Sequence, residues 1–362
     1  MSFENFREFR PQNRTDAPVI QAQAAGSEIA GVAVDEHGAG SLKSWAIPAT
    51  IVVAIEYLFA WVIGFGVGFH YRIPFESYAI GGVGIALAGV SVFIISTFVS
   101  YARQGEPRPA RRLLAEFPRC YGFVLGTVLV AVQMAVLTWT KIMLPLASPF
   151  WADPLLADLD QAIFGTDPWK ILEILFGWAA TTIDGAYVSW MVVKFATLAA
   201  VLATPESRRK TQAAFSYFLV LACTALGQYL LSSGGPVFYE RLGFGDRFDE
   251  LPIKPWVETA SSYLWHDYLR AGGDIGTGIS AMPSLHVAIA LWVALVMRAY
   301  LPRAAAIGYF YFALILIGSV LLGWHYAVDG IAAIAITLAS WRVAAGLPMA
   351  RRGRLLRTRA AA

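Results

Sequence analysis

Long apolar runs divide this chain, and short polar segments separate them. Eight runs approach the length of about 20 apolar residues that a helix needs to cross a bilayer about 30 Å thick. We predict a membrane-spanning helix over each of residues 45–69, 78–100, 121–146, 180–203, 212–232, 284–301, 304–324 and 326–346. The more polar segment 147–178 is predicted to form interfacial helix and loop.

The composition agrees with this pattern. Of the 362 residues, 57% are hydrophobic and only 15% are charged, whereas soluble proteins carry about 25% charged residues. The 12 tryptophans suit the aromatic belts found at membrane interfaces. We therefore predict an all-α polytopic membrane protein. The bilayer is its expected partner, and the net charge of +3 gives no reason to expect nucleic acid.

Lysine and arginine are spread unevenly among the polar segments. With the N-terminus placed in the cytoplasm, 20 of the 28 cationic residues fall on the cytoplasmic side and six fall in the opposite loops. Cytoplasmic loops of membrane proteins carry such an excess. We expect both termini to be cytoplasmic, with a flexible tail over 1–44 and a basic tail over 347–362. The loop 233–283 and the turn 324–326 then face outside.

Two histidines stand at the outer ends of apolar runs. His325 precedes Asp329 by four residues, so both side chains share a helical face. A carboxylate there can fix the imidazole tautomer and leave the other ring nitrogen as a nucleophile or base. The pair could instead only link helices, but ionisable groups inside a membrane are costly, which favours a functional role.

His286 follows Pro283 and Ser284 at the start of another run. Proline suits the first helical turn, and the unpaired amides of that turn attract anions. The Ser284 hydroxyl could donate a hydrogen bond to a phosphate held there. His286 could protonate the oxygen of the group that leaves the phosphate. The alternative is an ordinary capped helix behind a glycine-rich loop.

Together the two motifs resemble the type 2 phosphatidic acid phosphatase superfamily, whose pattern is P-S-x-H followed by H-x-x-x-D. Here His286 and His325 lie 39 residues apart. The resemblance implies a six-helix catalytic membrane domain over 120–346, with 45–119 as two additional helices and a basic loop. It also implies phosphohistidine chemistry without metal or cofactor. His325 would attack phosphorus, Asp329 would orient it, and His286 would protonate the leaving oxygen.

The chain also departs from the phosphatases of that superfamily. Their K-x6-R-P motif falls here on Gln228 to Pro236, and the arginine six residues before the second histidine is Ser319. The same departures occur in the branch similar to inositol phosphorylceramide synthase, and the segment 160–168 resembles that branch. This implies an inositolphosphotransferase-like headgroup transferase, acting on a lipid phosphate or phospholipid at the outer face of a bacterial plasma membrane. A lipid phosphate or polyprenyl diphosphate phosphatase remains the alternative.

Another cation must then neutralise the phosphate. Arg241, with Tyr239, is the preferred candidate because a Gly-Gly-Pro turn could carry it toward the motifs. A solvated loop arginine is the competing interpretation, and the other candidates are Arg247, Lys254 and Arg270.

Two other classes of function stay open. His286, His325 and Asp329 could hold a catalytic zinc ion. Alternatively, Glu56, Asp184 and Lys194 could serve a non-enzymatic lipid transporter. These three charges could also make bundle-stabilising contacts, and Lys194 could line a polar cavity. The oligomeric state is not predicted.

Overall fold

A computed structural model describes residues 42–69, 75–116, 118–270 and 272–347. The predicted tails, 1–44 and 347–362, lie almost entirely outside these residues. The described residues contain helices and turns without a strand, which confirms the all-α prediction. The first helices are α1 (Leu42–Gly66), α2 (Phe75–Arg103), α3 (Pro109–Glu116) and α4 (Pro118–Ala147). They are followed by α5 (Asp153–Phe164), α6 (Pro168–Phe176), α7 (Ala180–Val188) and α8 (Trp190–Ala203). The remaining helices are α9 (Arg208–Leu230), α10 (Pro255–Leu269), α11 (Leu285–Tyr300), α12 (Ala305–Leu321) and α13 (Ala327–Ala345).

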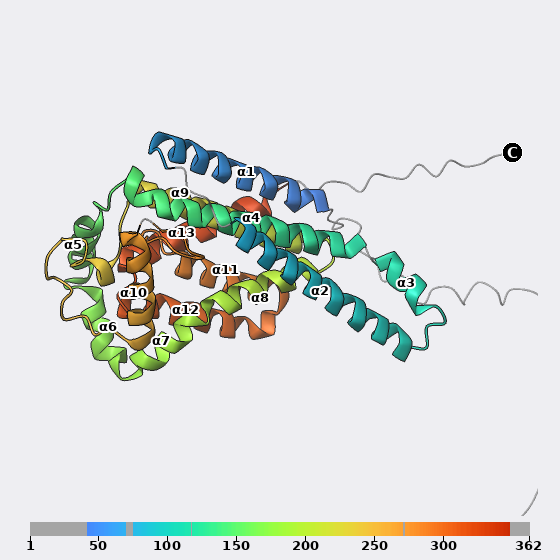
Figure 1. Ribbon diagram of the computed structural model, residues 1–362. Helices are drawn as coiled ribbons and strands as arrows, with labels where there is room; N and C mark the ends of the chain where they lie inside the picture. Colours follow the sequence, from blue (N-terminus) through green and yellow to red (C-terminus); the bar gives the residue numbers. More distant parts are fainter. Residues whose placement is uncertain (1–41, 70–74, 117, 271, 348–362) are drawn as a thin grey trace, which may run out of the picture. The chain divides into compact units, whose positions relative to one another are not determined.

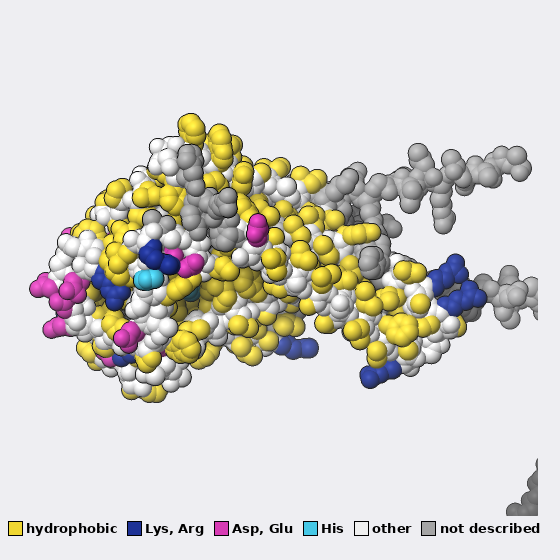
Figure 2. Space-filling model, viewed as in Figure 1, with side chains coloured by type: hydrophobic (Ala, Val, Ile, Leu, Met, Phe, Trp, Pro, Cys, Tyr) yellow, Lys and Arg dark blue, Asp and Glu magenta, His cyan; other side chains and the backbone are white. Residues whose placement is uncertain are grey.

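Every predicted span is largely helical in the structure. Seven helical stretches of the described chain are long and apolar enough to cross a membrane, and α8 and α11 are shorter apolar helices. One of the seven, Pro168–Val188, takes in part of the segment 147–178 that was predicted to be interfacial. Hydrophobic side chains cover the middle of the visible face, and charged side chains gather mainly toward its two ends (Figure 2). Such a surface suits a lipid environment. The chain is an integral, multi-pass membrane protein.

The predicted span 180–203 differs from expectation because it is divided into α7 and α8 at Ser189. The Ser189 hydroxyl donates to the Ala186 carbonyl at 2.6 Å, and the Ser189 amide donates to the same carbonyl at 3.1 Å. A serine that bonds the preceding turn competes with the regular helical pattern. The chain can therefore change direction before Trp190, which becomes a residue of the candidate site.

Helix α11 forms the centre of the bundle. It packs against α8, α9, α12 and α13, and its side chains are buried continuously from Val287 to Val296. Two polar contacts fix its position: Trp292 Nε1 donates to the Ala213 carbonyl of α9 at 3.0 Å, and Thr337 Oγ1 of α13 donates to the Ala288 carbonyl at 3.1 Å. A helix held on all sides gives His286, at its N-terminal end, a fixed position.

Helices α5, α6 and α10 lie together at one end of the bundle (Figure 1). Helix α5 packs on α13, α6 on α12, and α10 on α7. The ends of α12, α13 and α11 that carry the two histidine motifs therefore meet a layer of short helices. That layer supplies the polar contacts described below.

Candidate active site

His325 lies in the turn between α12 and α13, and Asp329 lies in the first turn of α13. The distance from His325 Nδ1 to Asp329 Oδ2 is 3.4 Å. This is long for a hydrogen bond, but catalytic contacts often shorten when substrate binds. In the described chain, His325 Nδ1 has no other partner. Asp329 Oδ2 also accepts the Tyr326 amide at 3.0 Å. The carboxylate thus faces Nδ1, and Nε2 is the nitrogen left for chemistry.

His286 stands opposite. Its ring centroid is 5.9 Å from that of His325. The His286 ring stacks on Tyr187 at 4.8 Å and lies 4.3 Å from the Trp190 ring. Trp190 Nε1 also donates to the His286 carbonyl at 3.1 Å. The predicted pair of histidines is therefore brought together, and aromatic side chains from α7 and α8 hold His286 in place.

Ser284 links the two motifs through their backbones. Its amide donates to the Asp329 carbonyl at 3.3 Å. Its buried hydroxyl oxygen caps α11 by accepting the Val287 amide at 3.3 Å. The amides of Leu285 and His286 have no recorded partner in the described chain. The first turn of α11 can thus donate to an anion, whereas the phosphate contact of the Ser284 hydroxyl stays a prediction.

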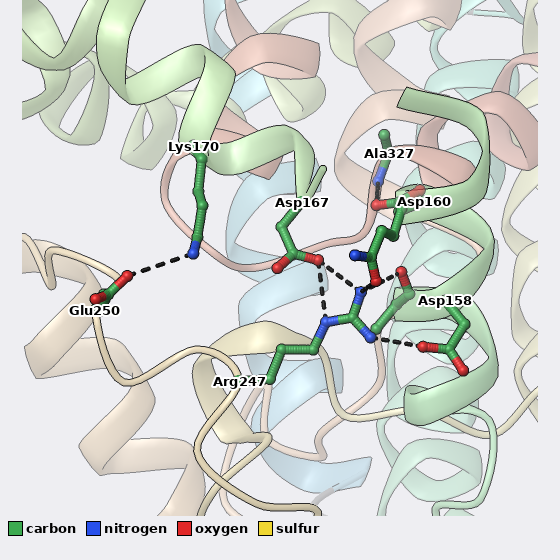
Figure 3. A network of polar contacts seen from close by, with 9 residues as sticks. Asp158, Asp160, Asp167, Lys170, Arg247, Glu250 and Ala327 are labelled. Atoms are coloured by element: carbon green, nitrogen blue, oxygen red, sulfur yellow. Dashed lines mark hydrogen bonds and ion pairs between the residues drawn. The ribbon is translucent and has the colours of Figure 1, made fainter. Parts of the chain in front are cut away.

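Two buried aspartates of α5 hold the loop that carries His325. Asp153 accepts the amides of Gly234 and Gly235, each at 2.8 Å, and the Tyr326 hydroxyl at 2.8 Å. Asp160 accepts the Ala327 amide at 2.7 Å (Figure 3). It also accepts the Val328 amide at 3.0 Å, so it binds the first two amides of α13. Asp153 thus joins the Gly234–Gly235 turn to the Tyr326 side chain, and Asp160 fixes the backbone that follows the nucleophile candidate.

Burial shifts the pKa values of the two aspartates and of Tyr326. Burial raises the pKa of Asp160 to about 6, although the two amides that donate to it oppose the rise. Burial also raises the pKa of Asp153, against the effect of its donors. Burial raises the pKa of the Tyr326 hydroxyl well above its usual value, and the neighbouring Asp153 charge adds to the rise. Tyr326 consequently keeps its proton and serves as a donor.

Arg247 braces α5 from outside. Its guanidinium contacts Asp158 at 2.7 Å and Asp167 at 2.8 Å, and it donates to the Ala157 carbonyl at 2.9 Å (Figure 3). The sequence marked Arg247 as a possible phosphate cation and did not reveal its partners. The regular spacing of Asp153, Asp160 and Asp167, seven residues apart, was the available signal for a bracing segment.

The sequence of this region also matches a known protein family. A family model described as the PAP2 superfamily matches residues 175–343. These residues form a PAP2 superfamily domain. The domain contains both histidines and Asp329, so the superfamily resemblance is confirmed for this part of the chain. The match specifies no branch within the superfamily. No curated protein and no solved structure matches the chain.

A cavity of about 760 Å³ opens beside the two histidines. This volume falls within the range of about 300–1,000 Å³ that is typical of ligand pockets. The PAP2 domain contributes α8 to its lining, and α2 and α4, which precede that domain, contribute further lining residues. On α4 the lining runs from Thr127 to Lys141, which is about 21 Å at 1.5 Å per residue. Most of the lining is apolar, with polar groups near the histidines.

Arg241 and Tyr239 lie elsewhere in the PAP2 domain. The Arg241 side chain is exposed, and its guanidinium carbon is 5.9 Å from the Trp265 ring centroid. Tyr239 is buried between Phe244 and Phe248, and burial raises its pKa. Neither residue is among those described as lining the cavity. Their predicted phosphate contacts stay predictions.

The remaining charged candidates have structural partners. Glu56 accepts Gln133 Nε2 at 2.6 Å, and the same nitrogen donates to the Phe218 carbonyl at 2.9 Å, which joins α1, α4 and α9. Asp184 accepts the Trp256 amide at 2.9 Å at the start of α10. Two of the three charges considered for a transporter thus hold helices together. Among the described residues, no three His, Cys, Asp or Glu side chains are arranged to hold a metal ion.

Proposed function

We propose that this protein transfers a phosphoryl group or phosphate-bearing headgroup from a lipid-linked phosphate through a phosphohistidine at His325. The proposal depends on the pairing of His325 with buried Asp329. The His325 ring centroid lies 5.9 Å from that of His286, and both histidines line a largely apolar cavity of about 760 Å³. PAP2 superfamily membership supports a lipid phosphatase or transferase type of activity.

In the first half of the reaction, His325 Nε2 attacks phosphorus and forms the P–N bond. The bond from phosphorus to the leaving oxygen breaks, and His286 gives that oxygen its proton. Asp329 stabilises the positive charge that develops on the His325 ring. The first-turn amides of α11 face the phosphate oxygens, where a helix N-terminus favours negative charge.

In the second half, an acceptor hydroxyl approaches the phosphohistidine. His286, now neutral, removes its proton, the acceptor oxygen binds phosphorus, and the P–N bond breaks. The histidines return to their starting state, so no further reactant is needed. Water as acceptor makes the enzyme a hydrolase, and a lipid or polyol hydroxyl makes it an inositolphosphotransferase-like enzyme.

Two buried polar atoms support a hydroxyl-rich acceptor. Gln228 Oε1 and Ser280 Oγ have no hydrogen-bond partner in the described chain, and both residues line the cavity. Buried polar atoms normally have hydrogen-bond partners, so a polar ligand could supply the partners that these two atoms lack. We therefore favour the transferase, with the phosphatase as the alternative outcome of the test.

The distribution of positive charge supports an extracytoplasmic site. The segments at the opposite end of the spans hold most of the Lys and Arg residues, and such segments are cytoplasmic in most membrane proteins. The proposed location is a bacterial plasma membrane. A membrane-impermeant phosphatidate analogue should be turned over by intact spheroplasts, and turnover only after permeabilisation would place the site inside.

The chemical proposal is tested by trapping the intermediate. Purified protein in nanodiscs is mixed with radiolabelled short-chain phosphatidate or phosphatidylinositol and quenched in alkali. Wild type should yield an acid-labile, base-stable phosphoprotein that His325→Ala lacks. His266→Ala, which alters an exposed histidine of α10, should retain it. Labelling of His325→Ala at the wild-type level would exclude the mechanism.

The acceptor is identified in a parallel assay. Turnover is measured with and without a diacylglycerol, ceramide or inositol acceptor, and the products are resolved by mass spectrometry. Acceptor-dependent formation of a new phosphate ester, a monoester from phosphatidate or a diester from phosphatidylinositol, supports the transferase. Release of free phosphate alone, whatever acceptor is present, would identify a phosphatase.

A further inference from the structure

Two lysines line the cavity that contains the histidines. Lys141 comes from α4 and Lys194 comes from α8. Gln228 and Ser319 are uncharged, so two positions at which the superfamily resemblance implies phosphate-binding cations carry none. Lys141 lies outside the PAP2 domain match, so motif spacing within that domain gives no indication of it.

The Trp190 side chain contacts both Lys194 and His286. Its Nζ lies 4.2 Å from the Trp190 ring centroid, and that ring is 4.3 Å from the His286 ring. The Lys194 ammonium is therefore no further from the His286 ring than the two separations combined, about 8.5 Å. Lys194 is only 2% exposed. Its closest recorded polar contact is the Met134 sulfur at 3.8 Å.

Lys141 is held by the loop that leads to Pro283. Gly278 has φ +96°, and a Cβ built on it would lie 2.5 Å from Lys141 Cβ. The loop therefore passes directly over this part of α4. Within the described chain, the Lys141 ammonium has no ion-pair or hydrogen-bond partner. Lys141, Lys194 and His286 all line the same cavity.

Three other cations near this end of the bundle have acidic neighbours, whereas exposed Arg241 lies near the Trp265 ring. Arg247 contacts Asp158 and Asp167, Lys254 lies 3.6 Å from Glu173, and Arg270 contacts Asp267 and Asp274. In contrast, the acidic residue recorded in the cavity lining is Asp184, which accepts the Trp256 amide at the start of α10.

Two ammonium groups in a poorly solvated cavity repel each other and lose hydration, and an anion between them offsets both effects. We infer that Lys141 and Lys194 bind the phosphate of a lipid substrate and hold it between His286 and His325. The lipid chain then extends along the apolar walls of α2, α4 and α8. The inference rests on the proposed function, since it assigns the phosphate contacts of that same site.

Binding without turnover tests it. Full-length His325→Ala protein in zwitterionic nanodiscs is titrated with dodecylphosphonate and with its uncharged dimethyl ester, and empty nanodiscs correct for partitioning. Lys141→Met and Lys194→Met should each weaken phosphonate binding at least tenfold and leave ester binding unchanged. Lys170→Met is the matched control, because Lys170 is exposed and pairs with Glu250. Phosphonate affinities within twofold of the parent in both cavity variants would overturn the inference.

Chemical protection covers the case in which the variants do not fold. Wild-type protein is reductively methylated with formaldehyde, with and without dodecylphosphonate, and modification is read by mass spectrometry. The phosphonate should protect Lys141 and Lys194 and leave Lys170 labelled. Equal labelling of the cavity lysines under both conditions would reject the inference. Because neither readout requires a phosphohistidine, lysine-dependent binding without a trapped intermediate would remove only the proposed chemistry.

Discussion

Replacement of Asp329 by asparagine isolates the charge behind the nucleophile. Asparagine keeps an oxygen that can accept the Tyr326 amide, which Asp329 Oδ2 accepts at 3.0 Å. It removes the negative charge 3.4 Å from His325 Nδ1. At this separation and an effective dielectric constant of about 20, the interaction with a cationic ring is about 5 kcal/mol. We therefore expect Asp329→Asn to form the phosphohistidine about three to four orders of magnitude more slowly.

The assay is rapid quench of phosphoprotein formation in a single turnover with short-chain phosphatidate. Asp160→Asn is the matched control, because Asp160 is a buried carboxylate at the same helix end that contacts the Ala327 and Val328 amides instead of an imidazole. We expect it to slow the reaction by less than about tenfold, as for a weakened helix cap. Similar losses in both variants would mean that the charge acts on the helix, and a rate above one tenth of wild type in Asp329→Asn would refute the electrostatic argument.

Three further predictions concern the surroundings of the site. Gly278→Ala should raise KM more than Gly276→Ala. Both glycines have positive φ, but only a methyl group added at position 278 would clash with Lys141. Equal KM values in the two variants would contradict a role for Lys141 in substrate binding. Arg247→Met should lower the melting temperature in detergent by several degrees through loss of its contacts with α5. Lys170→Met, which breaks an exposed pair, should change it by less, and a reversed order would count against the bracing role. Because the pKa of Asp160 is raised to about 6 in the fold from an ordinary 3.8, its contribution to stability is present below pH 4 and is lost as the pH rises through about 6. Asp160→Asn should therefore flatten the fall in melting temperature over this interval, and an unchanged pH profile would refute the assignment.

The membrane architecture could be predicted because hydropathy has a direct physical cause. A helix in lipid must satisfy its backbone internally and present apolar side chains, so each span appears as a run of suitable length. The break at Ser189 could not be read in this way, because it depends on one hydroxyl that bonds the preceding turn. The sequence predicted α11 only as an apolar run. Its central position depends on its packing against α8, α9, α12 and α13, which hydropathy does not reveal.

The two histidine motifs were predictable because His325 and Asp329 are close in sequence and because His286 belongs to a recognisable helix start. The support around them was not predictable. Asp153 and Asp160 act on backbone amides more than 75 residues away, and no local spacing encodes such contacts. Arg241 illustrates the converse case, because the glycine turn before it gives no information about the direction of its side chain.

The division of labour within the cavity follows from which helices form its walls. The PAP2 domain, residues 175–343, carries both histidines and Asp329. Helices α2 and α4 precede it, yet they line the same cavity, and α4 contributes Lys141. Tyr78 of α2 joins these parts: its hydroxyl accepts the Gly276 amide at 2.9 Å and lies 2.6 Å from Thr138 Oγ1 of α4. The loop that covers Lys141 is thus bound to the helix that the sequence marked as an addition. Under the proposed mechanism, the PAP2 domain would supply the histidines for phosphoryl transfer, and α2 and α4 would contact the lipid chain and the phosphate.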